Sequence, residues 1–157
     1  GAAPDRLRTC PASGRQTCRG GVLDHSVKER ARVVIAKSLD CGYCAGQRSH
    51  LGAQAGLTER EFDEVIEFRD STTLGDREKA ALKWAEAIAW DPNLADDELW
   101  AELHSHFTEP ELVELGYFIA LTMGQQKFLK TLDLRHGDLG VESLAGLAPE
   151  VAERLRG

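Results

Sequence analysis

Several features that would point directly to a membrane protein or a nucleic-acid-binding protein are missing from this sequence. No apolar run among its 157 residues approaches the roughly 20 that a helix needs to cross a bilayer, and no hydrophobic segment opens the chain. Positive charge is in deficit, because 19 Lys and Arg against 26 Asp and Glu give a net charge of −7. We therefore expect neither a membrane nor nucleic acid among its partners, and we expect a cytoplasmic location.

A strand pattern is missing as well. No stretch alternates apolar and polar residues, and apolar residues recur instead at the three- and four-residue spacing of helices. With 42% hydrophobic residues, the chain is long enough to bury a core as one domain. We predict an all-α fold, a single-domain helical bundle of about six helices over residues 23–157. A flexible N-terminal extension over residues 1–22, with prolines and little apolar periodicity, precedes it.

Residues that cap helices mark where most of the predicted helices begin. Ser26 and Glu29 form a candidate capping box within a helix over residues 24–39, and Thr58 and Thr108 open two further boxes. Asp40 is a good N-cap for a helix that carries two cysteines. The remaining predicted helices cover residues 76–90, a segment capped by Asp96 or Asp97, and residues 149–155.

Cysteine is scarce, and only one tight pair exists, Cys41-Gly42-Tyr43-Cys44. An N-cap at Asp40 places Cys41 in the first helical turn and Cys44 one turn further on roughly the same face. The exposed N–H groups and the helix dipole at that end favour a thiolate over a thiol. We predict a reversible Cys41–Cys44 disulfide that the other two cysteines, Cys10 and Cys18 in the extension, do not join.

Three other interpretations of the pair stay open. Two cysteines can pack as small apolar side chains, or they can form a permanent structural disulfide. Zinc is the third, with His50 as a further ligand. A structural zinc site usually takes four protein ligands, and Cys10 and Cys18 are spaced too widely to form the usual second pair. We expect no metal and no cofactor.

The segment from Glu29 to His50, together with "TLGDREKAALKWAEAI" and "FTEPELVELGYFIALTMGQQKFLKTLDL", resembles the carboxymuconolactone decarboxylase superfamily. The similarity is greatest to its alkylhydroperoxidase D-like branch, which keeps the C-x-x-C pair, and it spans roughly residues 24–135. The resemblance implies an all-helical alkylhydroperoxidase D-like fold that assembles as a trimer or a multiple of trimers. It also implies a thiol peroxidase that reduces hydroperoxides and is re-reduced by a dithiol donor such as a lipoylated protein.

Particular residues match the family pattern. Glu29 stands twelve residues before Cys41, where the family places a glutamate that acts as general base. By the same resemblance, Cys44 is the peroxidatic cysteine, Cys41 the resolving one, and Tyr43 the residue just before the second cysteine. A simpler interpretation of Glu29 is the capping box with Ser26.

Arg48 is where the sequence departs from the family, which places a proton-carrying histidine four residues after the second cysteine. Arginine stays protonated, so it cannot carry protons, but its charge can stabilise a thiolate if it faces the pair. It can equally point to solvent and pair with a carboxylate. His50 lies two residues on, about 200° round a straight helix. His25 lies one turn before Glu29 and can pair with it.

Two other functions therefore remain open. A decarboxylase or ring-lactone enzyme shares the fold, although such members generally lack the cysteine pair. The other is a non-catalytic oligomeric helical module with a degenerate site.

The helix that follows Thr108 is apolar nearly all round between Leu112 and Met123, which predicts burial on several sides and a subunit interface.

Overall fold

The computed structural model describes residues 21–132, and every regular element in this range is helical. The predicted all-α fold is confirmed, whereas the predicted helix over residues 149–155 and most of the predicted extension lie outside the described residues. The elements are α3 (His25–Ser38), α4 (Gly42–Gly46), α5 (His50–Gln54), α6 (Glu59–Glu64), the 3-10 turn η1 (Val65–Glu67), α7 (Asp76–Ala89), the 3-10 turn η2 (Pro92–Leu94), α8 (Asp97–His106) and α9 (Glu109–Thr131).

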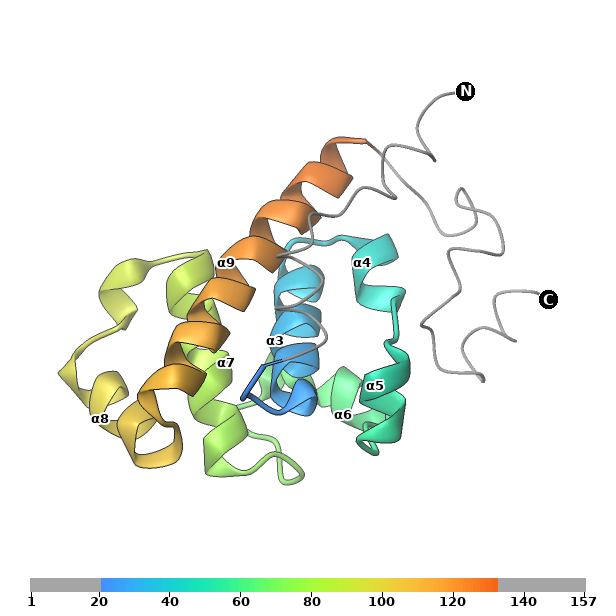
Figure 1. Ribbon diagram of the computed structural model, residues 1–157. Helices are drawn as coiled ribbons and strands as arrows, with labels where there is room; N and C mark the ends of the chain where they lie inside the picture. The colour runs from blue at the N-terminus through green and yellow to red at the C-terminus, as the bar shows by residue number, and fades with distance from the viewer. Residues whose placement is uncertain (1–20, 133–157) are drawn as a thin grey trace.

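Three helices, α3, α7 and α9, pack against one another and form the core (Figure 1). α8 packs on α7, while α4 and α5 pack on α3 (Figure 1). α7 and α9 approach closely where Trp84 faces Gly116, since a Cβ atom on that glycine would lie 2.9 Å from the indole ring. Fully buried side chains fill the space between the three helices, among them Val34, Ile35, Leu82, Leu115 and Ile119. No helix in the described part is both long and apolar enough to cross a bilayer.

The predicted capping boxes are confirmed at two of three positions. Thr58 and Thr108 each exchange hydrogen bonds with the glutamate three residues on, and Asp96 caps α8 by accepting from the Leu99 amide. The box at Ser26 is wrong, because α3 begins at His25 and places Glu29 in its second turn. The Glu29 carboxylate is thereby buried inside the molecule instead of capping a helix end.

The predicted helix with the cysteines is also wrong in detail. Asp40 has a φ of 51°, in the left-handed region that aspartate tolerates, and it turns the chain out of α3 instead of capping α4. Cys41 is the N-cap of α4, which lasts only five residues. The chain is extended at Gln47 and Ser49, and Ser49 caps a separate helix, α5, by accepting from the Gly52 amide. A serine whose side chain accepts from backbone N–H groups competes with helix continuation, and the spacing of the cysteines carries no sign of it.

Candidate active site

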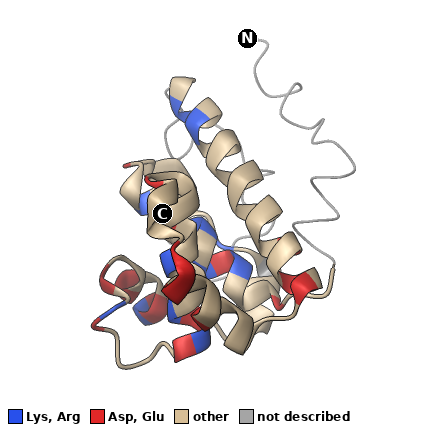
Figure 2. Ribbon diagram, turned by 90° about the vertical axis from the view of Figure 1, so that its left-hand side faces the viewer, with Lys and Arg blue, Asp and Glu red and all other residues tan. Residues whose placement is uncertain are grey.

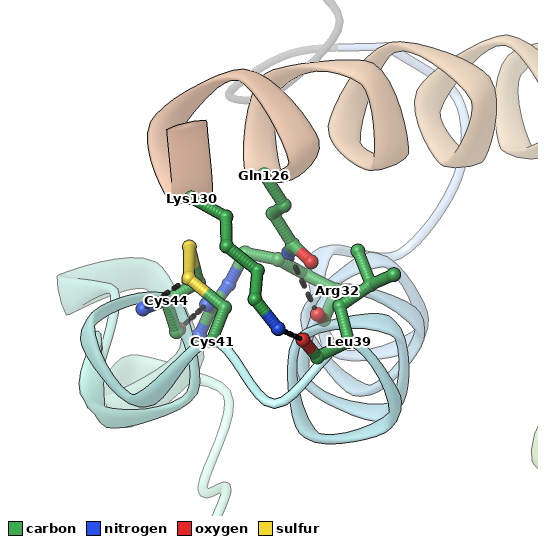
Figure 3. Close-up of a disulfide and its surroundings, with 6 residues drawn as sticks. All are labelled: Arg32, Leu39, Cys41, Cys44, Gln126 and Lys130. Atoms are coloured by element: carbon green, nitrogen blue, oxygen red, sulfur yellow. Dashed lines mark hydrogen bonds between the residues drawn. A yellow bond between two sulfur atoms is a disulfide. The ribbon is translucent and has the colours of Figure 1, made fainter. Parts of the chain in front are cut away.

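Cys41 and Cys44 are bonded to each other through their sulfur atoms, as predicted, with their Cα atoms 5.3 Å apart. The pair lies where the end of α3, the short helix α4 and the last turns of α9 meet (Figure 3). Both residues are buried, with Cys41 6% exposed and Cys44 3% exposed. Cys10 and Cys18 lie outside the described residues. The sequence therefore places a buried redox-capable pair at a junction of three elements.

Cys41 sits at the N-cap position of α4, and its sulfur accepts a hydrogen bond from the Cys44 amide at 3.4 Å. A sulfur that accepts from a backbone N–H is better able to carry negative charge. This contact is the physical reason to expect a stabilised thiolate on Cys41 once the disulfide is opened.

The last turns of α9 cover the pair. Leu129 packs against the apolar cluster that contains both cysteines, and the Lys130 amine donates to the Leu39 carbonyl oxygen (Figure 3). Tyr43 packs against the same cluster. Burial raises the pKa of the Tyr43 phenol, and the hydrogen bond with Gln47 lowers it by less, so the phenol keeps its proton at neutral pH. Tyr43 and Leu129 thus shield part of the pair.

Arg32 is a residue that sequence reasoning missed, and it bonds to the backbone of α4, which we call the redox helix. Its guanidinium donates to the carbonyl oxygens of Cys44 and Gln47, each at 2.6 Å. It also donates to Glu29 Oε1 at 2.6 Å. The spacing of Glu29 and Arg32, three residues apart on one helix, is the signal that predicts the pair. Gln126 on α9 donates to the Arg32 carbonyl oxygen at 3.0 Å and anchors this part of α3 (Figure 3).

Glu29 is almost completely buried and lies at the centre of a polar cluster. Its Oε1 accepts from Arg32 and from the Ser49 amide at 3.3 Å, while its Oε2 lies 3.7 Å from His25 Nε2. Burial raises the pKa of this carboxyl, but the charge and hydrogen bond of Arg32, the nearby His25 and the Ser49 amide outweigh it. The pKa therefore lies below its ordinary value, and the group is a carboxylate at neutral pH.

His25 completes this cluster, and its pairing with Glu29 is confirmed. Its Nε2 also lies 2.8 Å from Ser49 Oγ, which in turn accepts from the Gly52 amide at 2.9 Å. The His25 side chain is 19% exposed. A partly exposed imidazole thus contacts Oε2 of a buried carboxylate whose Oε1 accepts from Arg32.

Arg48 pairs with a carboxylate, as one of its two expected orientations has it, but it is buried instead of pointing to solvent. Its guanidinium donates to both Glu59 oxygens at 2.9 Å and to the carbonyl oxygens of Ala45 and Gln47. Its central carbon lies 4.2 Å from the centre of the Phe62 ring. His50 is the first residue of α5, beyond the break that follows α4. A catalytic role for Arg48, Tyr43 or His50 stays a prediction.

Within residues 21–132 no group of three or more His, Cys, Asp or Glu side chains is arranged to hold a metal ion. The sulfur atoms of Cys41 and Cys44 are bonded to each other in this structure. The site thus places a disulfide beside the charged cluster of His25, Glu29 and Arg32.

Comparison with known proteins identifies related sequences. The model of the carboxymuconolactone decarboxylase family matches residues 7–87, which is just over half of the chain. Two uncharacterised proteins of Mycobacterium tuberculosis, MT2376 and Rv2313c, are each 33% identical over 97 residues, 62% of this chain and 34% of theirs. The uncharacterised protein YnjA of Escherichia coli is 30% identical over 112 residues, 71% of this chain and 62% of its own. The chain thus spans about a third of the length of the M. tuberculosis relatives.

Solved structures share the fold at low sequence identity. The apo debrominase Bmp8 superposes with a TM-score of 0.60 at 19% identity, over 83% of this chain and 66% of the other. ATU0492 from Agrobacterium tumefaciens, a protein of unknown function linked by name to the antioxidant defence protein AhpD, superposes with a TM-score of 0.68. Its identity is also 19%, over 85% of this chain and 92% of the other. The likeness establishes the AhpD-like helical fold.

Proposed function

This chain belongs to the carboxymuconolactone decarboxylase family, which includes enzymes, and on that premise we propose that it is a thiol peroxidase that reduces hydroperoxides with Cys41 and Cys44. The observation that carries the proposal is the bonded pair itself, held at the start of α4 beside the charged cluster of Glu29 and Arg32. Two cysteines that form a disulfide can take up and release two electrons, as reduction of a hydroperoxide requires.

The oxidative half consumes one hydroperoxide. The Cys44 thiolate attacks the terminal peroxide oxygen, the O–O bond breaks, and the leaving oxygen takes a proton to become an alcohol or water. Cys44 is left as a sulfenic acid. The Cys41 thiol then attacks that sulfur, the S–S bond forms, and the sulfenic oxygen leaves as water with the thiol proton. Two thiols are oxidised for each peroxide reduced.

The reductive half needs a dithiol donor, which we propose to be the dihydrolipoyl group of a lipoylated protein. A donor thiolate attacks Cys41, the more exposed of the two cysteines, and Cys44 leaves as a thiolate near Arg32. The second donor thiol then attacks the donor sulfur of the mixed disulfide and releases Cys41. The Cys44 amide is placed to stabilise this second thiolate.

In this mechanism Glu29 acts through its charge and does not serve as the general base. Its carboxylate is tied to Arg32, and a lowered pKa makes it a weak proton acceptor. We assign it the task of holding Arg32 and His25 in place. This assignment differs from the general base that the family resemblance implies.

Thiol counting tests the function. The reduced protein, with Cys10 and Cys18 replaced by serine, is mixed with excess cumene hydroperoxide, and we expect two thiols to be lost per chain. Cys41→Ser should stop at a sulfenic acid that a dimedone reagent traps on Cys44, whereas Cys44→Ser should not react at a comparable rate. Equal rates of thiol loss in Cys44→Ser and in the parent protein would refute the proposed role of Cys44.

A decarboxylase and a non-catalytic oligomeric module are the alternatives. Neither requires the disulfide to be reducible under physiological conditions. A structural disulfide has a reduction potential well below that of a catalytic one, so equilibration with glutathione and with dihydrolipoamide separates the peroxidase from both alternatives. We expect dihydrolipoamide to open the Cys41–Cys44 bond.

A further inference from the structure

The cluster of His25, Glu29 and Arg32 is connected to the backbone of α4 by the hydrogen bonds of Arg32. α4 has only five residues, so its last carbonyl groups have no helical partners. Arg32 supplies donors to two carbonyl oxygens in this region, those of Cys44 and Gln47. A single side chain from α3 therefore fixes the backbone of the second cysteine.

The charge on Arg32 is close enough to act on the sulfur of Cys44. The guanidinium lies 2.6 Å from the Cys44 carbonyl oxygen, and bond lengths alone then limit its distance from Sγ to about 9 Å. A positive charge at that distance, in an effective dielectric constant of about 20, favours the charged thiolate over the neutral thiol. The Glu29 carboxylate, which shares the guanidinium, offsets part of this effect.

We propose that Arg32 is the positioning residue of the redox helix, and that His25 controls, through the shared Glu29 carboxylate, how much of the Arg32 charge acts on Cys44. When His25 is neutral, the charges of Glu29 and Arg32 cancel. When His25 is protonated, the cluster carries a net charge of +1, which favours the Cys44 thiolate. The group that changes charge is an imidazole, the side chain that ordinarily titrates between pH 5 and 8.

The surroundings of His25 support this role. Glu29 from α3 and Ser49 from the start of α5 face its Nε2, and Arg32 lies on the other side of Glu29. Because the imidazole is partly exposed, it exchanges protons with solvent while its carboxylate partner stays buried. Linkage then requires reciprocity: forming the Cys44 thiolate must favour protonation of His25 to the same extent.

Nuclear magnetic resonance titration of the imidazole protons tests this reciprocity directly. The His25 signal, assigned with the His25→Gln variant, is followed against pH in the oxidised and the reduced protein. We expect its titration midpoint to be higher in the reduced protein by about half a pH unit. His104 is an internal control, because it lies on α8 and pairs with Glu109 at the start of α9, away from the cysteines. A His25 change no larger than that of His104 would overturn the proposal.

A second experiment tests Arg32 by measuring thiolate absorbance near 240 nm against pH. The parent for this arm carries Cys10→Ser, Cys18→Ser and Cys41→Ser, so that only Cys44 titrates, and serine keeps the N-cap of α4. We expect Arg32→Gln to reduce the thiolate fraction at a given pH about tenfold, and Arg32→Lys to retain most of it. Arg69→Gln is the matched control, because Arg69 pairs with Glu86 on the exposed surface.

Both arms remain interpretable if a variant folds poorly or the proposed enzyme activity is absent. Arg32→Lys keeps the charge with fewer donors, so an unchanged thiolate fraction in Arg32→Lys with a large loss in Arg32→Gln supports the charge. Equal thiolate fractions in Arg32→Gln and Arg69→Gln would refute the role of Arg32. The proposal rests on Cys44 acting as the reactive thiol, but neither measurement uses peroxide, so failure of peroxidase activity and failure of this coupling are distinguishable.

Discussion

Arg48 is held by one carboxylate, two carbonyl oxygens and an aromatic ring at the same time. Hydrogen bonds that involve a charged group contribute roughly 1.5–3 kcal/mol each to stability. Its Glu59 partner is partly exposed and can be solvated alone, which reduces the cost of losing the pair. The contacts of Arg48 therefore join the end of α4 to α6 and stabilise the fold there.

The first prediction is that Arg48→His lowers the free energy of unfolding by about 2 kcal/mol and leaves the Cys44 thiolate titration unchanged. Urea denaturation and thiolate absorbance measure the two effects. Had Arg48 faced the sulfurs, the same variant would raise the Cys44 pKa and speed peroxide turnover. Finding that pattern would place Arg48 in the active site after all.

Glu64 is a residue whose ionisation stabilises the fold. Its carboxylate accepts hydrogen bonds from Thr73 Oγ1, Ser71 Oγ and Arg60 Nε. These hydrogen bonds lower the pKa of Glu64 to about 2. A carboxyl whose pKa is depressed in the folded state stabilises that state above its unfolded pKa, about 4.3, and loses this contribution as pH falls toward 2.

The second prediction follows from that sign. Between pH 4.3 and about 2, we expect the free energy of unfolding to fall less in Glu64→Gln than in the parent protein. The reason is that glutamine does not take up a proton in this range. Urea midpoints measured at a series of pH values for both proteins check it. Glu98→Gln, on the exposed start of α8, is the control and should leave the acid slope as it is. Parallel curves for parent and Glu64→Gln would contradict the prediction.

At the scale of elements, the last turns of α9 cover part of the redox pair. Leu129 packs on the cysteine cluster, and the hydrogen bond of Lys130 to Leu39 joins α9 to the end of α3. Both cysteines are buried beneath this cover. Attack on a disulfide requires the incoming thiolate to reach one sulfur atom, so the cover sets a steric limit on the rate.

The third prediction is that Leu129→Ala speeds reduction of the Cys41–Cys44 bond by dithiothreitol several-fold. We expect a loss of stability of about 1–2 kcal/mol, below the range for a fully buried leucine, because Leu129 is only partly buried. Stopped-flow thiol appearance and urea denaturation measure these effects. Lys127→Ala, an exposed neighbour on the same helix, should change neither. An unchanged reduction rate in Leu129→Ala would mean that the cover is not limiting.

Sequence patterns predicted elements better than they predicted the site. The boxes at Thr58 and Thr108 were predictable because capping chemistry is local to four residues. The break after α4 was not, since it depends on Ser49 capping α5 and on Arg32 satisfying carbonyl groups from a different helix. The pair of Cys41 and Cys44 and the match of Glu29 were visible in the sequence, but the partners that give Glu29 its role are set by packing.

At the scale of the whole molecule, α9 carries acidic residues at its start and lysines near its end, with an uncharged middle (Figure 2). One face of it packs on α3 and α7 through buried residues such as Leu115 and Ile119. Another face presents apolar side chains to solvent: Val113 is 70% exposed, Tyr117 55% and Phe128 56%. Exposed apolar residues at helical spacing on one helix are typical of an interface with a partner.

The fourth prediction is that this face joins copies of the chain into a homotrimer or a multiple of trimers. The motivation is the exposed apolar face of α9 together with the assembly that the family resemblance implies. We expect light scattering at micromolar concentration to give at least three times the chain mass, and Tyr117→Glu to lower it by placing charge in the interface. Ile66→Glu, which changes an exposed apolar residue on η1, should leave the mass unchanged.

Phe128 directly precedes Leu129, so the interface would adjoin the cover of the redox pair. Tyr117→Glu should then also speed reduction of the disulfide by dithiothreitol. A monomeric parent protein would refute both expectations, whereas an unchanged reduction rate in a dissociated variant would place the interface away from the cysteines.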